Sequence, residues 1–166
     1  MYWPAIAILA FVALQRLSEL RIAKANTARL LAAGAVEHAP GHYPLIVAVH
    51  ALWLATLVIF APGREISWPF LALFVMLQLG RVWVLRTLGP RWTTRIIILP
   101  GASLVTGGPF RFLSHPNYAV VVSEIAVLPL AFGLWELALI FSILNALVLT
   151  IRVRAESAAL AQASRP

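Results

Sequence analysis

Apolar residues along this chain gather in five long runs that are separated by shorter polar stretches. A hydrocarbon layer of ~30 Å is crossed by about 20 helical residues at about 1.5 Å each. Each run is long enough, or nearly so, to cross a membrane as a helix. The pattern predicts an all-α integral membrane protein with five transmembrane helices, forming a single domain over residues 1–166. The runs cover approximately 3–20, 43–61, 67–86, 117–133 and 134–152.

The connections between the runs differ in length and character. Pro62–Ile66 joins the second and third runs as a tight hairpin, and Gly133 separates the last two. Segment 24–42 is predicted to be a loop with some helical character. Segment 87–116 is rich in Pro and Gly but keeps many apolar side chains, which favours an ordered loop. Long ordered loops are usually functional.

Composition narrows the class of protein. The 166 residues are 61% hydrophobic and 11% charged, with a mean hydropathy of +0.89, which excludes an ordinary soluble domain. Cysteine is absent, which excludes disulfides, a thiolate metal site and a cysteine nucleophile. The net charge is +7, but the basic residues are scattered among apolar runs. We therefore expect no nucleic-acid partner and no metal site.

The positions of Lys and Arg predict the orientation in the membrane, because cytoplasmic segments carry an excess of these residues. Only Arg64 lies in a connection on the other side. We expect the N-terminus outside and the C-terminus in the cytoplasm. The basic residues assigned to the cytoplasmic side are Arg16, Arg21, Lys24, Arg29, Arg81, Arg86, Arg91, Arg95, Arg111, Arg152, Arg154 and Arg165.

Polar residues inside the runs cluster toward the predicted cytoplasmic half. They are His50, Gln78, Arg81, Glu124 and Asn145. Such groups are costly in a membrane and are candidates for function, so the asymmetry favours a chamber open to the cytoplasm over a pore. The alternative is that a Glu124–Arg81 pair or a His50 hydrogen bond merely fastens helices together.

The densest polar motif runs from Gly108 to Tyr118. Pro116 suits the first turn of a helix, where its missing N–H costs nothing, and Ser114 or His115 would then cap the fourth run. The free N–H groups at such a helix start can hold a carboxylate or a phosphate. The alternative is that Ser-His-Pro is only a cap followed by a proline.

A second motif ends the fifth run. Arg152 and Glu156 are spaced i, i+4 and share a helix face, and Asn145 lies on the face of Arg152 at i, i+7. An Arg there can pair with an anion and a Glu can bind an ammonium group, although each could also be a boundary ion pair. Together with the 108–118 motif, they suit a zwitterionic cofactor beside an anionic lipophilic acceptor.

These motifs resemble a known family. Leu104–Tyr118, followed by Arg152-x-x-x-Glu156-x-x-x-Leu160, is similar to the isoprenylcysteine carboxyl methyltransferase family. Further positions are similar to a compact bacterial branch that methylates alkylpyrones or alkylresorcinols on oxygen. They are Arg16–Leu20, Ala25–Asn26, Leu30–Leu31, Gly34, His42–Pro44 and Leu88–Arg95.

The resemblance implies an S-adenosyl-L-methionine-dependent O-methyltransferase in the bacterial inner (cytoplasmic) membrane, with a helical-bundle active site at the cytoplasmic face. Arg152 and Glu156 would be catalytic. Arg152, with Asn145, would meet a lipophilic small-molecule acceptor surrounded by membrane lipid, and Arg95 would close the pocket. The residues implied to contact the cofactor are Ala102, Ser103, Leu104, Val105, Phe110, His115, Pro116, Asn117, Tyr118 and Glu156.

Three positions depart from the family pattern. Ser114 stands where the family usually has Arg, Ser157 where it often has a second Glu, and Phe110 where Tyr is common. A positive charge and a hydroxyl are lost, and Arg111 is placed to compensate for the charge. The His, the Arg and the first Glu are kept, so we expect an active enzyme.

Two other functions compete with this one. A phospholipid N-methyltransferase would prefer an acidic pocket for its amine acceptor, and Arg152 argues against it. A transporter or lipid-binding protein would place polar residues in both leaflets and show a pseudo-symmetric repeat. The sequence has neither feature.

Overall fold

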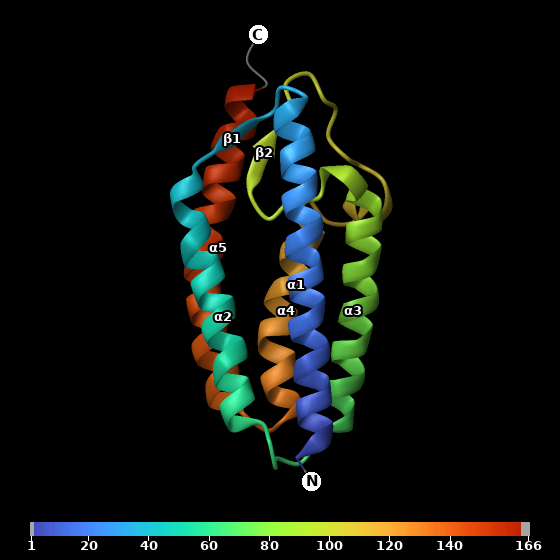
Figure 1. Cartoon of the computed structure of the whole chain (residues 1–166), viewed down its shortest axis with the longest axis vertical. Helices are drawn as coiled ribbons and strands as arrows, with labels where there is room; N and C mark the ends of the chain where they lie inside the picture. Colours follow the sequence, from blue (N-terminus) through green and yellow to red (C-terminus); the bar gives the residue numbers. More distant parts are fainter. Residues whose placement is uncertain (1, 164–166) are drawn as a thin grey trace.

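The fold is a bundle of helices that alternate in direction. The computed structural model describes the backbone of residues 2–163 and the side chains of residues 2–161. Within that part the helices start and end at opposite ends of the bundle, and so do the two termini (Figure 1). The prediction of a helical architecture is confirmed. The α-helices are α1 (Trp3–Ala32), α2 (Tyr43–Phe60), α3 (Trp68–Leu88), α4 (Pro116–Ala131) and α5 (Trp135–Ala163).

The predicted membrane spans are supported in part. Among the described residues, three helical segments are long and apolar enough to cross a membrane: Pro40–Phe60, Trp68–Arg91 and Trp135–Ala161. α4 is apolar but shorter, at 16 residues. Length and composition therefore support three spans, and the count of five stays a prediction.

α1 extends further than the sequence predicted. Residues 24–32 were expected to belong to a loop with some helical character around 28–33, but they continue the helix without a break to Ala32. Good helix formers such as Ala and Leu fill this stretch. The buried Asn26 amide also donates to the carbonyls of Trp92 (2.8 Å) and Gly89 (3.2 Å), which holds the helix against the end of α3. The helix stops before Gly34, whose φ of 89° suits glycine.

A two-stranded ribbon covers one end of the bundle. β1 (Val36–His38) pairs antiparallel with β2 (Ile96–Ile98), so that the predicted ordered loop carries a strand. Arg95 Nη1 bonds Glu37 Oε1 at 2.7 Å beside the pairing. This ribbon end is where α1, α3 and α5 finish and α2 and α4 begin (Figure 1). Three short 3₁₀ turns lie near it: η1 (Pro40–His42), η2 (Gly89–Arg91) and η3 (Gly108–Arg111).

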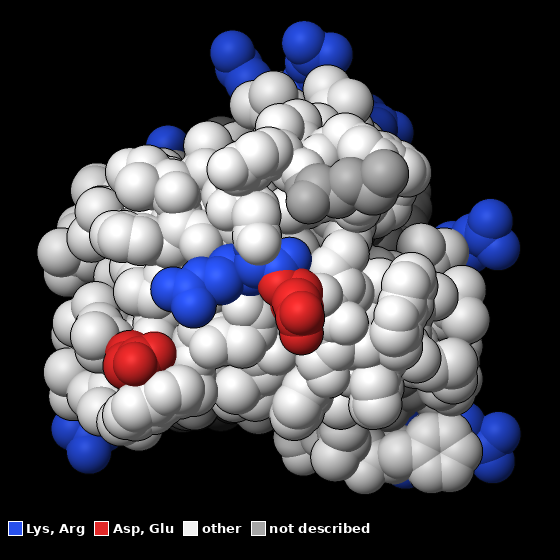
Figure 2. All heavy atoms as spheres, turned by 90° about the horizontal axis from the view of Figure 1, so that it is seen from below, with Lys and Arg blue, Asp and Glu red and all other residues white. Residues whose placement is uncertain are grey.

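Charge is unevenly divided between the two ends. The face opposite the ribbon is mostly uncharged (Figure 2). Arg64 lies in the α2–α3 connection at that face. On the ribbon side, Arg91 follows α3, Arg111 precedes α4 and Arg154 lies in the C-terminal turns of α5. Arg165, which entered the orientation prediction, lies outside the described residues.

Gly108 fixes the close approach of η3 to α3. Its φ is 56°, and a Cβ added to it would lie 2.5 Å from Thr87 Oγ1. We expect Gly108→Ala to lower the free energy of unfolding by about 1–2 kcal/mol, because of the left-handed backbone alone. Neighbouring Gly107 has an ordinary φ of −84° and open space around it, so Gly107→Ala should change stability by less than about 0.5 kcal/mol. Thermal unfolding of the two variants in detergent makes the comparison, and equal stability would contradict it.

Candidate active site

A cavity of about 430 Å³ lies under the ribbon. Sites for small molecules are commonly about 300–1,000 Å³. Its walls come from the ends of α1, α3, α4 and α5 and from the 91–118 connection. The lining residues are Leu30, Leu88, Arg91, Trp92, Thr93, Arg95, Ile96, Ile97, Ile98, Leu99, Ala102, Ser103, Leu104, Val105, Phe110, Ser114, His115, Asn117, Tyr118, Arg152, Glu156 and Leu160. We call this cavity the chamber.

Tyr118 joins the two predicted catalytic residues. Arg152 Nε donates to the Tyr118 hydroxyl at 2.8 Å, and that hydroxyl donates in turn to Glu156 Oε2 through a short hydrogen bond. Arg152 and Glu156 lie one turn apart on α5, whereas Tyr118 lies in the first turns of α4. The hydroxyl therefore fixes both charged groups relative to the start of α4.

Arg152 keeps one donor group free. Its Nη1 donates to the backbone carbonyl of Thr94 at 2.7 Å, and its Cζ lies 5.6 Å from the centre of the Tyr118 ring. Within the described part of the chain, Nη2 has no hydrogen-bond partner. The guanidinium is thus held rigidly on one side and can pair with an anion on the other.

Aromatic and polar groups at the start of α4 complete this wall. The His115 and Tyr118 rings stack, with centres 5.2 Å apart and planes at 20°. Asn117 Oδ1 is buried and accepts no hydrogen bond from any described residue. A buried acceptor without a donor calls for an explanation, and Asn117 is one of the residues that line the chamber.

The opposite wall is built by the 91–105 connection. Arg91 Nη1 donates to the carbonyl of Ser103 at 2.5 Å and holds the two parts of this connection together. The guanidinium of Arg95 lies 4.6 Å from the centre of the Tyr43 ring. The Tyr43 hydroxyl also accepts a bond from Thr94 Oγ1 at 3.3 Å. Arg95 is therefore held beside the chamber by groups from α2 and β1.

Most of the residues predicted from sequence meet in the chamber. Pro116 and Asn145 are exceptions: both are buried, but neither lines it. Pro116 begins α4 as predicted, but the capping position is His115 and no side chain of Ser114 or His115 caps the helix. The predicted residues that line the chamber are Ala102, Ser103, Leu104, Val105, Phe110, His115, Asn117, Tyr118, Arg152 and Glu156.

Sequence reasoning missed several residues that shape the chamber. Trp92 is 4% exposed and lines it, Thr94 offers only its backbone oxygen to Arg152, and Tyr43 lies under Arg95. Tyr43 and Trp92 stand in the stretches 42–44 and 88–95 that resemble the family. That resemblance was the only signal that could have found them.

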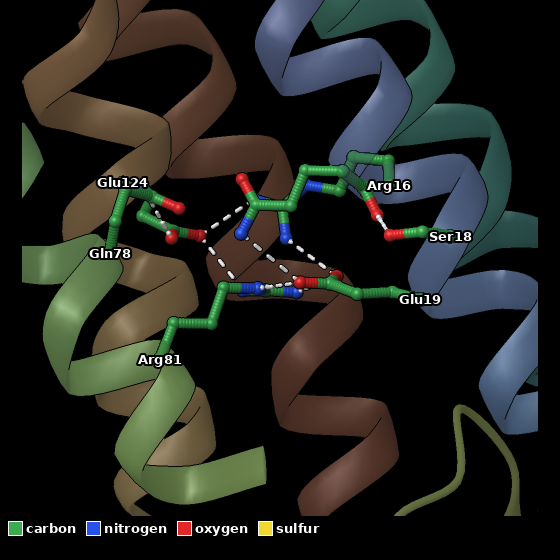
Figure 3. Close-up of polar contacts among 7 residues, drawn as sticks. Arg16, Ser18, Glu19, Gln78, Arg81 and Glu124 are labelled. Carbon is green, nitrogen blue, oxygen red and sulfur yellow. Dashed lines mark hydrogen bonds and ion pairs between the residues drawn. The ribbon is translucent and has the colours of Figure 1, made fainter. Parts of the chain in front are cut away.

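A second polar cluster lies deeper in the bundle, and the close-up shows its side chains converging from α1, α3 and α4 (Figure 3). Arg81 bonds both oxygens of Glu19 with Nε and Nη2, at 2.5 and 2.6 Å. Arg81 Nη1 and Arg16 Nη2 both reach Glu124 Oε2, at 2.9 and 2.6 Å. Gln78 Nε2 donates to the other Glu124 oxygen at 2.8 Å. We call these five residues the ion cluster.

The ion cluster favours the structural interpretation of these intramembrane charges. Its two guanidiniums and two carboxylates balance, and none of its members lines the chamber. The expected Glu124–Arg81 pair is confirmed. Arg16 was counted as a cytoplasmic charge, but it pairs with a fully buried carboxylate inside the bundle because α1 continues past it. His50 Nδ1 bonds the Ile46 carbonyl of its own helix at 2.8 Å, and His50 has no ion pair or hydrogen bond to another helix among residues 2–161.

The comparisons with known proteins agree with the motifs. A sequence model of the isoprenylcysteine carboxyl methyltransferase family matches residues 70–162. This match contains η2, β2, η3, α4 and nearly all of α5, and with them most of the chamber wall.

Two bacterial relatives extend the similarity to the N-terminal half. The uncharacterized protein YpbQ of Bacillus subtilis is 38% identical over 99% of each chain. An uncharacterized protein of Haemophilus influenzae is 24% identical over 87% of this chain and 88% of its own. No solved structure matches.

Proposed function

The chain belongs to the isoprenylcysteine carboxyl methyltransferase family, and from this premise we propose that it transfers a methyl group from S-adenosyl-L-methionine to an oxygen of a lipophilic small molecule. The observation that carries the proposal is the linkage of Arg152, Tyr118 and Glu156 in one chamber. It puts a cation for the acceptor and a carboxylate for the cofactor one helical turn apart.

The residues present fit the cofactor. An ammonium group needs acceptors, and the chamber offers the Glu156 carboxylate, with Asn117 also among its lining residues. The stacked rings of His115 and Tyr118 and the apolar side chains of Leu104 and Val105 suit less polar parts of the molecule. The cavity volume is in the range of small-molecule sites.

Arg152 supports an anionic oxygen acceptor over an amine. A carboxylate, enolate or phenolate would pair with its free Nη2, whereas a protonated amine would be repelled. This contrast disfavours phospholipid N-methylation. We assign the acceptor to the class of bacterial amphiphiles with an acidic head and an alkyl tail, such as alkylpyrones or alkylresorcinols.

The chain's own groups act by positioning and electrostatics. When bound, S-adenosyl-L-methionine supplies a methyl group activated by a positively charged sulfur. Arg152 orients the acceptor oxygen and favours its ionised form, so that no general base is needed. Tyr118 and Thr94 hold Arg152 in place, and such fixed orientation accounts for a large part of the rate enhancement in group transfer.

We place the chamber at the cytoplasmic side of the bacterial inner membrane, with all five helices crossing it. Support comes from the alternating directions of the helices and from the basic residues near the ribbon end, where S-adenosyl-L-methionine would be accessible. α4 has 16 residues, about 24 Å at 1.5 Å per residue, and lies between α3 and α5. The N-terminus would then be outside the cell.

Binding of S-adenosylhomocysteine tests the proposal. We expect the purified protein in detergent to bind it, and Glu156→Gln to weaken the affinity by about 10–100-fold. That loss corresponds to one hydrogen bond to a charged group, worth about 1.5–3 kcal/mol. Titration calorimetry measures both constants.

Glu65→Gln serves as the matched control, because Glu65 is exposed in the α2–α3 connection at the opposite end. It should leave the affinity unchanged. Absence of saturable binding by the wild-type protein would overturn the cofactor assignment. Equal binding by the Glu156 variant would remove that residue from the site.

A further inference from the structure

A groove of about 310 Å³ runs between α1 and the end of α3. Trp92, which is 4% exposed, is the one lining residue that the groove shares with the chamber. The groove is thus separate from the site described above. Its lining residues are Ile22, Asn26, Arg29, Leu85, Arg86, Gly89, Pro90 and Trp92.

Two arginines from different helices border the groove without a counter-charge. Arg29 bonds only the neutral Asn26 Oδ1, at 2.9 Å, and Arg86 has no hydrogen-bond or ion-pair partner within residues 2–161. None of the six glutamates, all of them described, forms an ion pair with either arginine. The groove therefore presents two positive charges that the protein leaves unneutralised.

The rest of the groove is apolar and faces outward. Ile22 is 49% exposed and lies on the same face of α1 as Asn26 and Arg29, at i, i+4 and i+7. Leu85 forms the facing wall on α3. The groove lies near the ribbon end, where both helices finish (Figure 1). On α1, Ile22 lies seven residues before Arg29, about 10 Å nearer the middle of the bundle at 1.5 Å per residue, whereas Leu85 and Arg86 are neighbours on α3.

We propose that this groove binds an anionic phospholipid, with the headgroup phosphate between Arg29 and Arg86 and an acyl chain along Ile22 and Leu85. Basic pockets between transmembrane helices on the cytoplasmic side suit such headgroups. Guanidiniums pair with phosphate through charge-assisted hydrogen bonds, bidentate where the geometry allows. A zwitterionic lipid adds a cation beside the two arginines and binds more weakly.

A bound lipid is also expected to stabilise the junction between α1 and the end of α3. The groove lies where Asn26 joins α1 to the Gly89 and Trp92 carbonyls, and Gly89, Pro90 and Trp92 all line it. A lipid that bridges Arg29 and Arg86 ties the same two helix ends together. Because it binds the folded protein, it raises the unfolding temperature.

Native mass spectrometry of the full chain in detergent, titrated with phosphatidylglycerol or phosphatidylcholine, tests the proposal. We expect saturable binding of phosphatidylglycerol, with phosphatidylcholine at least tenfold weaker. In Arg29→Gln/Arg86→Gln the affinity for phosphatidylglycerol falls by about 30-fold, the effect of two interfacial arginines. Arg111→Gln/Arg154→Gln, which removes two exposed arginines of the same end, keeps wild-type affinity.

Arg29→Lys/Arg86→Lys keeps both positive charges and controls for misfolding. This variant must still prefer phosphatidylglycerol if the neutral variant loses its affinity because the charges are gone. Thermal shift with each lipid gives a second readout. Equal affinities of the neutral pair and the control pair, or equal binding of the two lipids, overturns the proposal. Saturating S-adenosylhomocysteine leaves lipid binding unchanged, so this outcome does not depend on the proposed methyl transfer.

Discussion

Arg152→Ala is expected to lower the rate of methyl transfer by about 10²–10³-fold. Removing one preorganised charged donor from an active site typically has an effect of this size. In this protein the guanidinium is held by Tyr118 and by the Thr94 carbonyl, and its free Nη2 remains for the acceptor. Alanine removes the group that would orient and ionise the acceptor oxygen.

The measurement is turnover with radiolabelled S-adenosyl-L-methionine and an alkylresorcinol as acceptor. Arg154→Ala is the matched control, because Arg154 is exposed two residues further along the same helix; it should keep wild-type turnover. Arg152→Lys should recover only part of the loss, because an ammonium group cannot reproduce the two fixed hydrogen bonds. Full turnover by Arg152→Ala would show that the acceptor does not depend on this residue.

Glu124→Ala is expected to destabilise the protein by about 3–5 kcal/mol, the usual effect of removing one partner from a buried ion pair. Glu124 is fully buried and receives bonds from Arg16, Gln78 and Arg81. Its loss leaves two guanidiniums facing one carboxylate in the bundle interior. The same change should leave the chamber residues in place, because the hydrogen bonds of Glu124 go to Arg16, Gln78 and Arg81, none of which lines the chamber.

Thermal unfolding and denaturant titration in detergent measure this effect. Glu136→Ala is the control, because Glu136 is exposed in the first turn of α5 and should cost less than about 0.5 kcal/mol. A loss for Glu124→Ala no larger than that of the control would mean that the ion cluster does not hold α1 to α3 and α4.

The long apolar runs were sufficient to locate the five helices, but they missed the C-terminal ends of α1 and α5, which extend to Ala32 and Ala163. Residues 24–32 lie beyond the first apolar run and were expected to form a loop with some helical character. They stay helical because Asn26 reaches backbone carbonyls more than sixty residues away in the sequence. Contacts to a distant backbone leave no pattern in the side chains, and a run of three β-branched residues such as Ile96–Ile98 does not show with which segment it pairs. Such features become visible only in the structure.

The sequence predicted part of the chamber for a similar reason, because local spacing is visible in it and helix packing is not. Spacing placed Arg152 and Glu156 on one face of α5, and the 102–118 motifs supplied most of another wall. Spacing did not reveal that Tyr118 stands between the two charges, because that geometry depends on how α4 packs against α5. Asn145 shares the face of Arg152 and is buried, but the chamber ends before it.

Charged residues within apolar runs were the hardest to interpret. Arg16 and Arg81 contributed to the orientation prediction as though they faced the cytoplasm, yet both belong to the ion cluster. Their partners Glu19 and Glu124 come from two different helices, so no local window links them. The remaining basic residues near the ribbon end still favour the same orientation.

Ultraviolet cross-linking of methyl-labelled S-adenosyl-L-methionine to the purified protein, followed by peptide mapping, tests the central claim most directly. We predict label on peptides that contain residues 102–118 or 152–160, abolished by excess S-adenosylhomocysteine and strongly reduced in Glu156→Gln. Label confined to other peptides, or label that excess S-adenosylhomocysteine does not remove, would contradict the assignment of the chamber as the cofactor site.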